Sequence, residues 1–360
     1  MPNKNTFLGK TNKNSLKGLI NYGIIAVFFA VITIVKGAGG LSNALEGQLI
    51  PICAYIIMAL SLNLVVGISG ELSLGHAGFM SVGAFTGVIV AGAMKYHGVN
   101  ANAPRLIVAI IVGAIFAGAA GILIGIPVLR LRGDYLAIVT LAFGEIIKNV
   151  LNCLYVGVDA KGLHFSVTDE VHMDMAANGT TLVRGPMGAV GISKASTFLA
   201  GIILIVLVLF VIQNLVNSRT GRAIMAIRDN RIAAEASGIN VTKYKMIAFV
   251  TSAVIAGAAG ALYALNYSTI VPKKFDFNTS ILVLVFVVLG GIGNMTGSII
   301  AAALLTVLPE LFRQFQDYRM LVYAIVLILV MIATNNERIR AFWKKLTGVF
   351  SGKKGGAANE

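Results

Sequence analysis

The sequence predicts an all-α integral membrane protein, a polytopic bundle of about ten transmembrane helices. Three observations lead to this fold class. Hydrophobic residues make up 57% of the chain and charged residues only 12%, about half the share in a soluble domain. The mean hydropathy is +0.84. Apolar runs recur along the whole chain, and most basic residues lie between them.

The apolar runs give the predicted spans, because a bilayer core requires about 20 apolar residues per helix. The runs are 18–36, 48–67, 72–94, 105–129, 134–157, 196–216, 246–270, 279–293, 297–312 and 319–335. The eighth and ninth are short and flank a glycine-rich segment. The sequence leaves open whether 279–312 forms two spans or one span with a re-entrant segment.

The distribution of Lys and Arg predicts the orientation. With both termini in the cytoplasm, eighteen of these residues fall on inside segments and ten on outside segments, which agrees with the positive-inside rule. The chain then comprises a cytoplasmic N-terminal tail (1–17), a transmembrane domain (18–335) and a basic cytoplasmic C-terminal tail (336–360). Two connections are long: an extracytoplasmic loop at 158–195 and a cytoplasmic loop at 217–245.

Several classes of protein are excluded at this stage. The net charge of +14 does not indicate nucleic-acid binding. The basic residues lie between the predicted membrane spans, and no stacking aromatic residues lie among them. Cys53 and Cys153 both lie in apolar runs and give neither metal-ligand spacing nor a disulfide framework. The chain lacks the common hydrolase, metalloprotease and nucleotide-binding motifs, so we expect no enzyme activity, no ATPase motif, no cofactor and no metal.

The segment 67–79 places Glu71, Ser73 and His76 among glycines between two apolar runs. Irregular backbone is tolerated at membrane depth only where protein or a water-filled cavity surrounds it. A short cytoplasmic turn with Glu71 near a helix start explains the same pattern, and the sequence does not decide between the two. His76 is a candidate ligand or proton site, although a hydrogen-bonded structural histidine is the more common role.

The run 134–157 carries a second polar set. Glu145 and Lys148 are three residues apart and share a helix face, with Asn149 beside them. Ionisable residues within a span are functional candidates by default. A pair near the outer interface that neutralises itself is the alternative. We therefore name Ser73, His76, Glu145, Lys148 and Asn149 as candidate residues of a translocation path.

The small-residue stretch 117–121 recurs as 256–260, each reading Ala-Gly-Ala-Ala-Gly. Duplicated halves are common among transporters, but small residues also recur by chance in membrane helices. The cytoplasmic loop contains good helix formers from Asp229 to Ala236, followed by Gly238 as a stop signal. Either a basic helix on anionic lipid or a short helix that docks on a cytoplasmic partner would fit.

The loop also carries a family resemblance. Glu235-Ala236-Ser237-Gly238 resembles the coupling loop of ABC-importer permeases. Further stretches resemble the larger, LivM-type permease of branched-chain amino acid importers. They are Leu72-Ser73-Leu74-Gly75-His76-Ala77-Gly78-Phe79, Arg132-Gly133-Asp134-Tyr135-Leu136-Ala137, Gly221-Arg222-Ala223-Ile224-Met225-Ala226-Ile227-Arg228-Asp229 and Val287-Val288-Leu289-Gly290-Gly291-Ile292-Gly293. The resemblance extends from about residue 51 to residue 331.

The resemblance implies a helical permease subunit in a bacterial-type plasma (inner) membrane, with branched-chain amino acids as its solutes. It implies four kinds of neighbour: a second homologous permease subunit, two cytoplasmic ATPase subunits, an extracytoplasmic solute-binding protein and membrane lipid. The surface that would contact an ATPase comprises Arg222, Arg228, Asp229, Glu235, Ala236, Ser237 and Gly238.

One stretch departs from the family pattern. The family's Thr-Gly-Gly-x-x-Gly turn is matched most nearly by 184–188, after an inserted stretch within 158–183. Urea and short-amide ABC permeases are closely similar, so they are the first alternative for the solute. An ion-coupled secondary amino acid carrier that uses Glu145, Lys148 and His76 is the second, and a structural membrane protein the third.

Overall fold

The computed structural model describes residues 4–37, 43–129, 134–173, 175–176, 178–311, 325 and 328. The chain divides into two units, 1–306 and 307–360. Every described residue of the second unit is helical. The predicted tail 336–360, most of the predicted span 319–335 and the connection 130–133 lie outside the described residues. The account below concerns the first unit.

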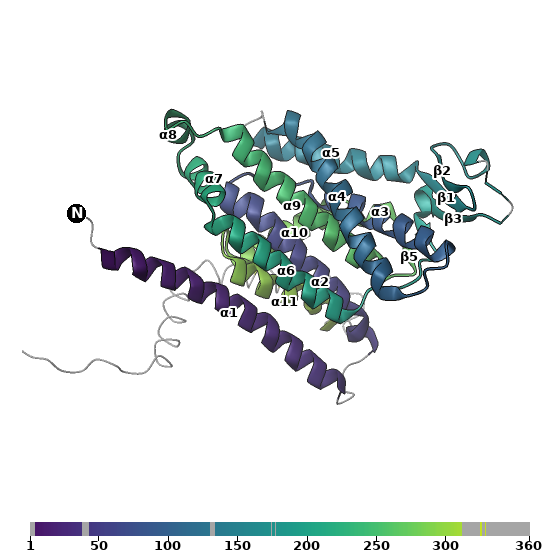
Figure 1. Ribbon diagram of the computed structural model, residues 1–360, viewed down its shortest axis with the longest axis horizontal. Coiled ribbons are helices and arrows are strands. Elements are labelled where there is room, and N and C mark those ends of the chain that lie inside the picture. Colours follow the sequence, from purple (N-terminus) through teal and green to yellow (C-terminus); the bar gives the residue numbers. More distant parts are fainter. Residues whose placement is uncertain are drawn as a thin grey trace, which may run out of the picture. The chain divides into compact units, whose positions relative to one another are not determined.

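Helices make up most of the first unit (Figure 1). In chain order they are α1 Lys4–Gly37, α2 Asn43–Asn63, the π-helix η1 Leu64–Ser69, α3 His76–Tyr96, α4 Asn102–Val128, α5 Asp134–Asn152, α6 Phe198–Asn217, α7 Arg219–Asp229, α8 Arg231–Ala236, α9 Val241–Ala264, α10 Phe277–Gly290 and α11 Met295–Leu311. The last of these continues past the boundary between the units.

Each predicted run from 18–36 to 297–312 corresponds to helix, and the differences lie at the ends. The first helix begins at Lys4, inside the predicted tail 1–17. α3 begins at His76, four residues later than predicted, because glycines and serines precede it. Among the described residues, six helices are long and apolar enough to cross a membrane: α2 with η1, α3, α4, α5, α6 and α9. α10 and α11, with 14 and 17 residues, are shorter.

The prediction of an all-α fold was wrong in one region. The segments predicted as the ends of two spans and as the outer loop form a five-stranded antiparallel sheet in the order β2-β1-β3-β4-β5. Its strands are β1 Tyr155–Asp159, β2 Gly162–Ser166, β3 Thr180–Arg184, β4 Ala189–Val190 and β5 Thr269–Ile270.

A local reason explains the missed strands. β1 reads Tyr-Val-Gly-Val-Asp and directly follows α5, so it extended the apolar run although its β-branched residues favour a strand. α5 therefore ends at Asn152 and α9 at Ala264, before the predicted ends at 157 and 270. Short 3₁₀ turns lie between the strands and helices: η2 Val171–Met173, η3 Gly185–Met187 and η4 Pro272–Phe275.

Small residues allow α9 to pack closely against α2, α3 and α4. A Cβ atom added at Gly257 would lie 2.7 Å from the carbonyl oxygen of Gly113 and collide with the side chain of Ala117. The two Ala-Gly-Ala-Ala-Gly stretches, 117–121 and 256–260, therefore meet at Ala117 and Gly257 in the α4–α9 contact, whereas Gly260 packs against Met80 of α3. Close approach of two helices gives each stretch a packing role, whether or not they arose by duplication.

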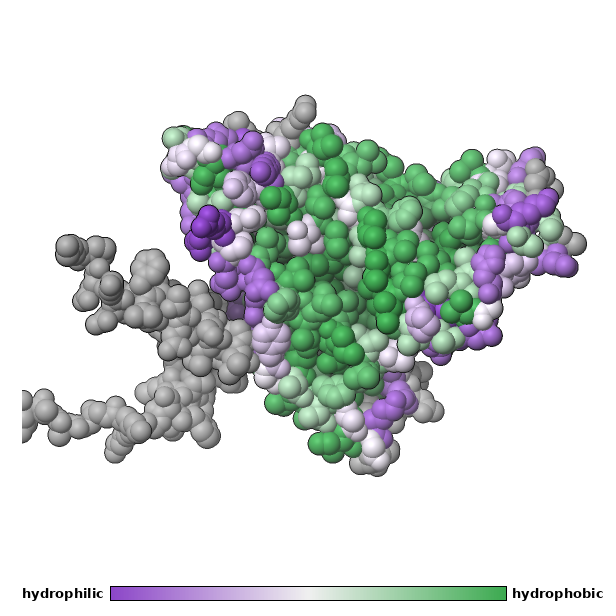
Figure 2. Space-filling view, viewed as in Figure 1, coloured by the Kyte–Doolittle hydropathy of each residue, from purple (hydrophilic) through white to green (hydrophobic). Residues whose placement is uncertain are grey.

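The face of the helical part that Figure 2 shows is largely apolar, and its two ends are polar. α4 and α6 contribute large exposed hydrophobic side chains to this apolar surface, including Ile107, Ile111, Ile115, Leu123, Ile203 and Phe210. In water such a continuous patch would be unfavourable, whereas it matches the hydrocarbon core of a bilayer. α7 and α8 lie at one end of the bundle and the sheet at the other (Figure 1).

The α4–α9 contact predicts the effect of one substitution. In Gly257→Val the new side chain must displace backbone of α4, so we expect destabilisation of about 1–3 kcal/mol and a lower Tm in detergent. Gly23→Val is the matched control, because nothing lies within 4 Å of a Cβ atom at exposed Gly23. Equal melting temperatures for the two variants would contradict the proposed contact.

Candidate functional site

The helical path of the chain is interrupted between α2 and α3. The π-helix η1 ends at Gly70, which adopts a left-handed conformation with φ of +76° and donates its N–H to the carbonyl of Val65. Residues 71–75 follow without regular helix, and α3 begins at His76. This segment is the one that the sequence marked as irregular and polar. We refer to residues 64–75 as the α2–α3 break.

Asn63 joins the break to the turn between α10 and α11. Its Oδ1 accepts a hydrogen bond from the N–H of Gly293 at 2.8 Å, and its amide donates to the hydroxyl of Ser298 at 3.0 Å. Asn63 and Ser298 are fully buried. A Cβ atom at Gly67 would lie 2.7 Å from Cα of Gly293, so glycine is required at this approach. The break and the α10–α11 turn therefore form one packed unit.

A second set of buried hydrogen bonds surrounds the start of α3. The ring Nε2 of His76 is hydrogen-bonded to the hydroxyl of Ser61. The hydroxyl of Ser252 donates to the carbonyl of Ser61 at 2.8 Å, and the N–H of Ala77 donates to the hydroxyl of Ser280 at 3.1 Å. α2, α3, α9 and α10 meet here through polar groups that water does not reach.

The structure separates the predicted path residues into two groups. Ser73 and His76 are buried, with 0% and 1% of their surface exposed. The Ser73 hydroxyl has no hydrogen-bond partner among the described residues. On α5, by contrast, Glu145 and Lys148 form an ion pair that is partly exposed, and Asn149 is exposed. Glu145 nevertheless lies beside the start of α3, because it lines a small cavity together with Gly75 and Gly78.

α5 packs directly on the break. The N–H of Leu74 donates to the Thr140 hydroxyl at 3.1 Å. A Cβ atom at Gly75 would overlap the carbonyl of Thr140, and one at Gly144 would lie 3.2 Å from Cα of Gly75. The other face of α5 is uncovered, and its exposed residues are Tyr135, Ile138, Ile146, Asn149 and Val150. A displacement of the break would therefore act directly on the helix that carries Glu145 and Lys148.

α7 and α8 form a short, well-capped pair at the opposite end from the sheet (Figure 1). Ser218 caps α7 by accepting from the N–H of Gly221, and Asn230 caps α8 by accepting from the N–H of Ala233. Gly238 ends α8 with a left-handed φ of +79°, which orients the chain into α9. Sequence signals predicted both this helix and its stop.

α7 buries Ile224 and Ile227, whereas α8 buries only Ala234 and exposes most of its other side chains. Ala234 packs with Ile227 of α7 and Val241 of α9. Ile232 is 80% exposed, and Arg231 donates to Glu235 at 3.0 Å along the surface. The structure places the predicted coupling residues Glu235, Ala236, Ser237 and Gly238 together on this exposed side, and Arg222 and Asp229 are exposed on α7.

Two contacts connect this end of the bundle to the α2–α3 break. Arg228 donates to the carbonyl of Gly67 at 3.0 Å, and its side chain lies against Gly70, where an added Cβ would be 2.6 Å from Cγ of Arg228. Lys245 of α9 pairs with Glu71 within the break. The contacts of Arg228 and Lys245 with the break were not anticipated from the sequence, because no local pattern records a contact across more than 150 residues.

Asn63 and Ser298 were also missed. The signal that could have identified Asn63 is an amide within an otherwise apolar run, since a buried polar group needs a partner.

Among the described residues, no group of His, Cys, Asp or Glu is suited to hold a metal ion.

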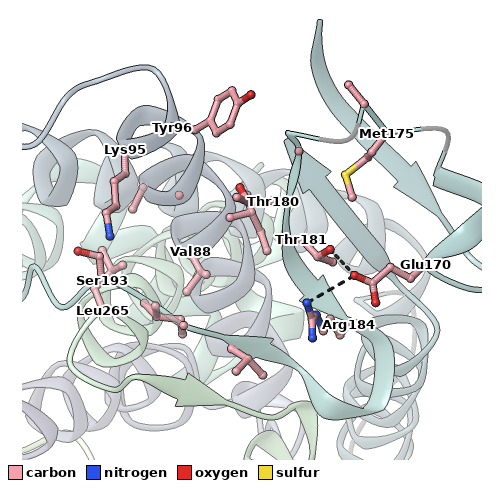
Figure 3. Close-up of a pocket in the computed structure, with 18 residues that line it drawn as sticks. Val88, Lys95, Tyr96, Glu170, Met175, Thr180, Thr181, Arg184, Ser193 and Leu265 are labelled. Carbon is pink, nitrogen blue, oxygen red and sulfur yellow. Dashed lines mark hydrogen bonds and ion pairs between the residues drawn. The ribbon is translucent and has the colours of Figure 1, made fainter. Parts of the chain in front are cut away.

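A pocket of about 970 Å³ opens at the sheet end, between the outer end of α3, β3 and the connection from β4 to α6 (Figure 3). Charged side chains at its edge are Lys95 on α3, Glu170 before η2 and Arg184 on β3. Arg184 pairs with Glu170 at 3.5 Å, and the Thr181 hydroxyl also donates to Glu170. No local sequence signal predicts this pocket, because its walls come from segments that are distant along the chain.

Asp159 organises the inserted loop of the sheet. Its carboxylate accepts from the N–H groups of Lys161, Gly162 and Ala176 at 2.7, 3.1 and 3.2 Å, and pairs with His164 at 3.0 Å. Burial of the carboxyl acts to raise its pKa. The hydrogen bonds from Ala176 and Lys161 and the interaction with His164 outweigh that effect and lower the pKa to about 2.

The comparisons with known proteins follow this geometry. The model of the family described as branched-chain amino acid transport system, permease component, matches residues 45–331. The chain belongs to this family. Membership defines a multi-pass membrane protein and a transport subunit rather than an enzyme. No solved structure matches the chain.

Three relatives specify the family further. The high-affinity branched-chain amino acid transport system permease protein LivM of Escherichia coli K12 is 40% identical over 77% of this chain and 66% of the relative. LivM of Salmonella typhimurium LT2 gives the same identity and coverage. A probable LivM of Methanocaldococcus jannaschii is 26% identical over 72% of this chain and 79% of the relative. The chain spans just under two thirds of the length of the two bacterial relatives and is a LivM-type permease.

The pKa of Asp159 predicts a pH-dependent loop. The carboxylate stabilises the β1–β2 region above its unfolded-state pKa near 3.8 and loses this effect as the pH falls to about 2. Pepsin should therefore leave this loop intact at pH 4 and cleave it rapidly at pH 2. Asp159→Asn should be cleaved at both values. Equal cleavage of the unmodified protein at pH 4 and pH 2 would contradict the assignment.

Proposed function

We propose that this chain is the permease subunit of a binding-protein-dependent ABC importer that moves leucine, isoleucine and valine across the plasma membrane. Separate cytoplasmic ATPase subunits would drive it. Family membership supports this function. The mechanism rests on one structural observation: Arg228 connects the exposed α7–α8 pair to the α2–α3 break through its hydrogen bond with Gly67. A permease without chemistry of its own requires such a connection to an energy source.

The exposed side of α8 has the properties of a docking surface. The helix is short, capped at both ends and fixed by Ala234, so it can move as a rigid element. Arg222, Asp229, Glu235, Ala236, Ser237 and Gly238 would contact one ATPase subunit. Arg228, the remaining predicted coupling residue, would instead transmit the movement to the break through its contact with Gly67. A helix set in a groove of its partner is a common recognition mode, and the 80% exposure of Ile232 supplies an apolar anchor.

The uncovered face of α5 would line the translocation path with a second, homologous permease subunit. A lipid-facing helix that carries Glu145, Lys148 and Asn149 is unfavourable, since charged groups at membrane depth require water or protein around them. A partner subunit opposite this face satisfies that requirement. Ser73 and His76 would lie behind α5 and respond to movement of the break.

The proposed topology places α7–α8 and both termini in the cytoplasm and the sheet outside the inner membrane. The bundle would then comprise about ten spans within 18–335, with α10 and α11 among them. The tails 1–17 and 336–360 would be cytoplasmic, and 217–245 would be the coupling loop. The outer loop 158–195 would face an extracytoplasmic solute-binding protein.

The docking proposal predicts the outcome of reversing one charge. Glu235→Lys removes the pair with Arg231 and places two cations side by side on α8. We expect co-purification of the ATPase subunits with the permease to fall at least about tenfold, and ATP-driven leucine uptake into proteoliposomes to fall with it.

The matched control is Glu46→Lys, which changes a carboxylate whose side chain is 46% exposed at the sheet end of the bundle. The control should retain both ATPase association and uptake. Normal association and uptake in the Glu235→Lys transporter would show that α8 is not the docking element.

A further inference from the structure

The pocket at the sheet end is lined by both aliphatic and polar side chains. Its aliphatic lining is formed by Val88, Leu182, Val190, Ile192 and Leu265. Its polar groups lie on two sides: Lys95 and Ser193 on one, and Glu170 and Arg184 on the other (Figure 3). Its volume of about 970 Å³ is at the upper end of the range for small-molecule sites. Such a combination suits a small ligand that has both an aliphatic and a charged part.

The charges of the pocket are not balanced within the described residues. Glu170 is already held by Arg184 and Thr181. Lys95 has no carboxylate partner among the described residues, and its side chain is directed toward Ser193 (Figure 3). The pocket therefore presents a cation and a hydroxyl donor on the side opposite to the Glu170–Arg184 pair.

A buried guanidinium lies directly behind Ser193. Arg105 is 1% exposed, yet among the described residues it has no carboxylate partner and its Nε has no hydrogen-bond partner. It donates to Asn102 at 2.8 Å and to the hydroxyl of Ser193 at 3.1 Å. An unpaired buried cation is costly. An anionic group bound at Ser193 would lower that cost and would also pair with Lys95.

The pocket adjoins the proposed path. Arg184 is followed by Gly185, whose N–H donates to the carbonyl of Leu154 just beyond the end of α5 at 3.0 Å. α5 carries Glu145, Lys148 and Asn149 on the helix that continues from this point into the bundle. The Arg184 side of the pocket therefore lies next to the end of α5.

We propose that this pocket is an entry site for the free α-amino acid, which binds its carboxylate at Lys95 and Ser193, with Arg105 behind, and its branched side chain against the aliphatic lining. The inference rests on the proposed function, because it takes the transported solute as the ligand.

The test measures ligand binding to the assembled transporter in nanodiscs, without binding protein and without ATP. Saturation-transfer NMR should detect saturable binding of leucine. 4-Methylpentanoate, which keeps the carboxylate, should compete with leucine for the site, whereas leucinamide, which lacks the carboxylate, should not. Lys95→Met should weaken binding at least about tenfold through loss of a charge-assisted contact, and Lys95→Arg should retain it. Lys161→Met, at an exposed lysine outside the pocket, is the control.

Three outcomes would overturn the proposal: no saturable binding of leucine, equal competition by leucinamide, or unchanged leucine affinity in Lys95→Met. Weaker binding of the solute-binding protein to Lys95→Met, with leucine affinity unchanged, would assign the pocket to protein docking and so also overturn it. ATP-driven leucine uptake by the same preparation is measured in parallel. If uptake is absent, the proposed function fails; if uptake is normal and the pocket binds nothing, only this inference fails.

Discussion

The contact between Arg228 and the carbonyl of Gly67 is the constraint on which the remaining structure depends. It ties an exposed helix pair at one end of the bundle to a non-helical segment inside it. Gly67 in turn packs on Gly293, and Asn63 locks the α10–α11 turn to the same point. Because these contacts involve backbone atoms and glycines, the break has little freedom to adjust locally. A displacement of α7 is therefore expected to move the break, α5 and the α10–α11 turn together.

The two ends of the molecule have different roles in this account. The end with α7 and α8 presents capped, rigid helices, which suits the transmission of force from a partner. The sheet end presents a pocket lined by charged and aliphatic side chains, which suits recognition of a solute. α5 connects the two ends, since it packs on the break through Thr140 and Gly144 and ends beside the pocket residue Arg184. A permease driven by a separate ATPase would require both properties.

The helical part of the fold could be predicted from the sequence because lipid imposes length and apolarity on each span. α8 was also predictable, since Gly238 and the good helix formers before it are local signals. The sheet was not, because β1 continues the apolar run of α5 and periodicity alone does not separate the two. The partners of Arg228, Glu71 and Asn63 could not be predicted for another reason, because contacts between distant segments produce no local sequence pattern. The pocket was missed on the same ground, since its walls meet only in the folded chain.

The most direct measurement compares ATP hydrolysis with leucine uptake in the assembled transporter when Arg228 is replaced by Gln. Arg219→Gln, at an exposed position that begins α7, is the control. The account predicts that Arg228→Gln retains its ATPase subunits and hydrolyses ATP, while uptake per ATP falls at least about tenfold, because α7 no longer moves the break. Wild-type uptake per ATP in Arg228→Gln would contradict the central role of this contact.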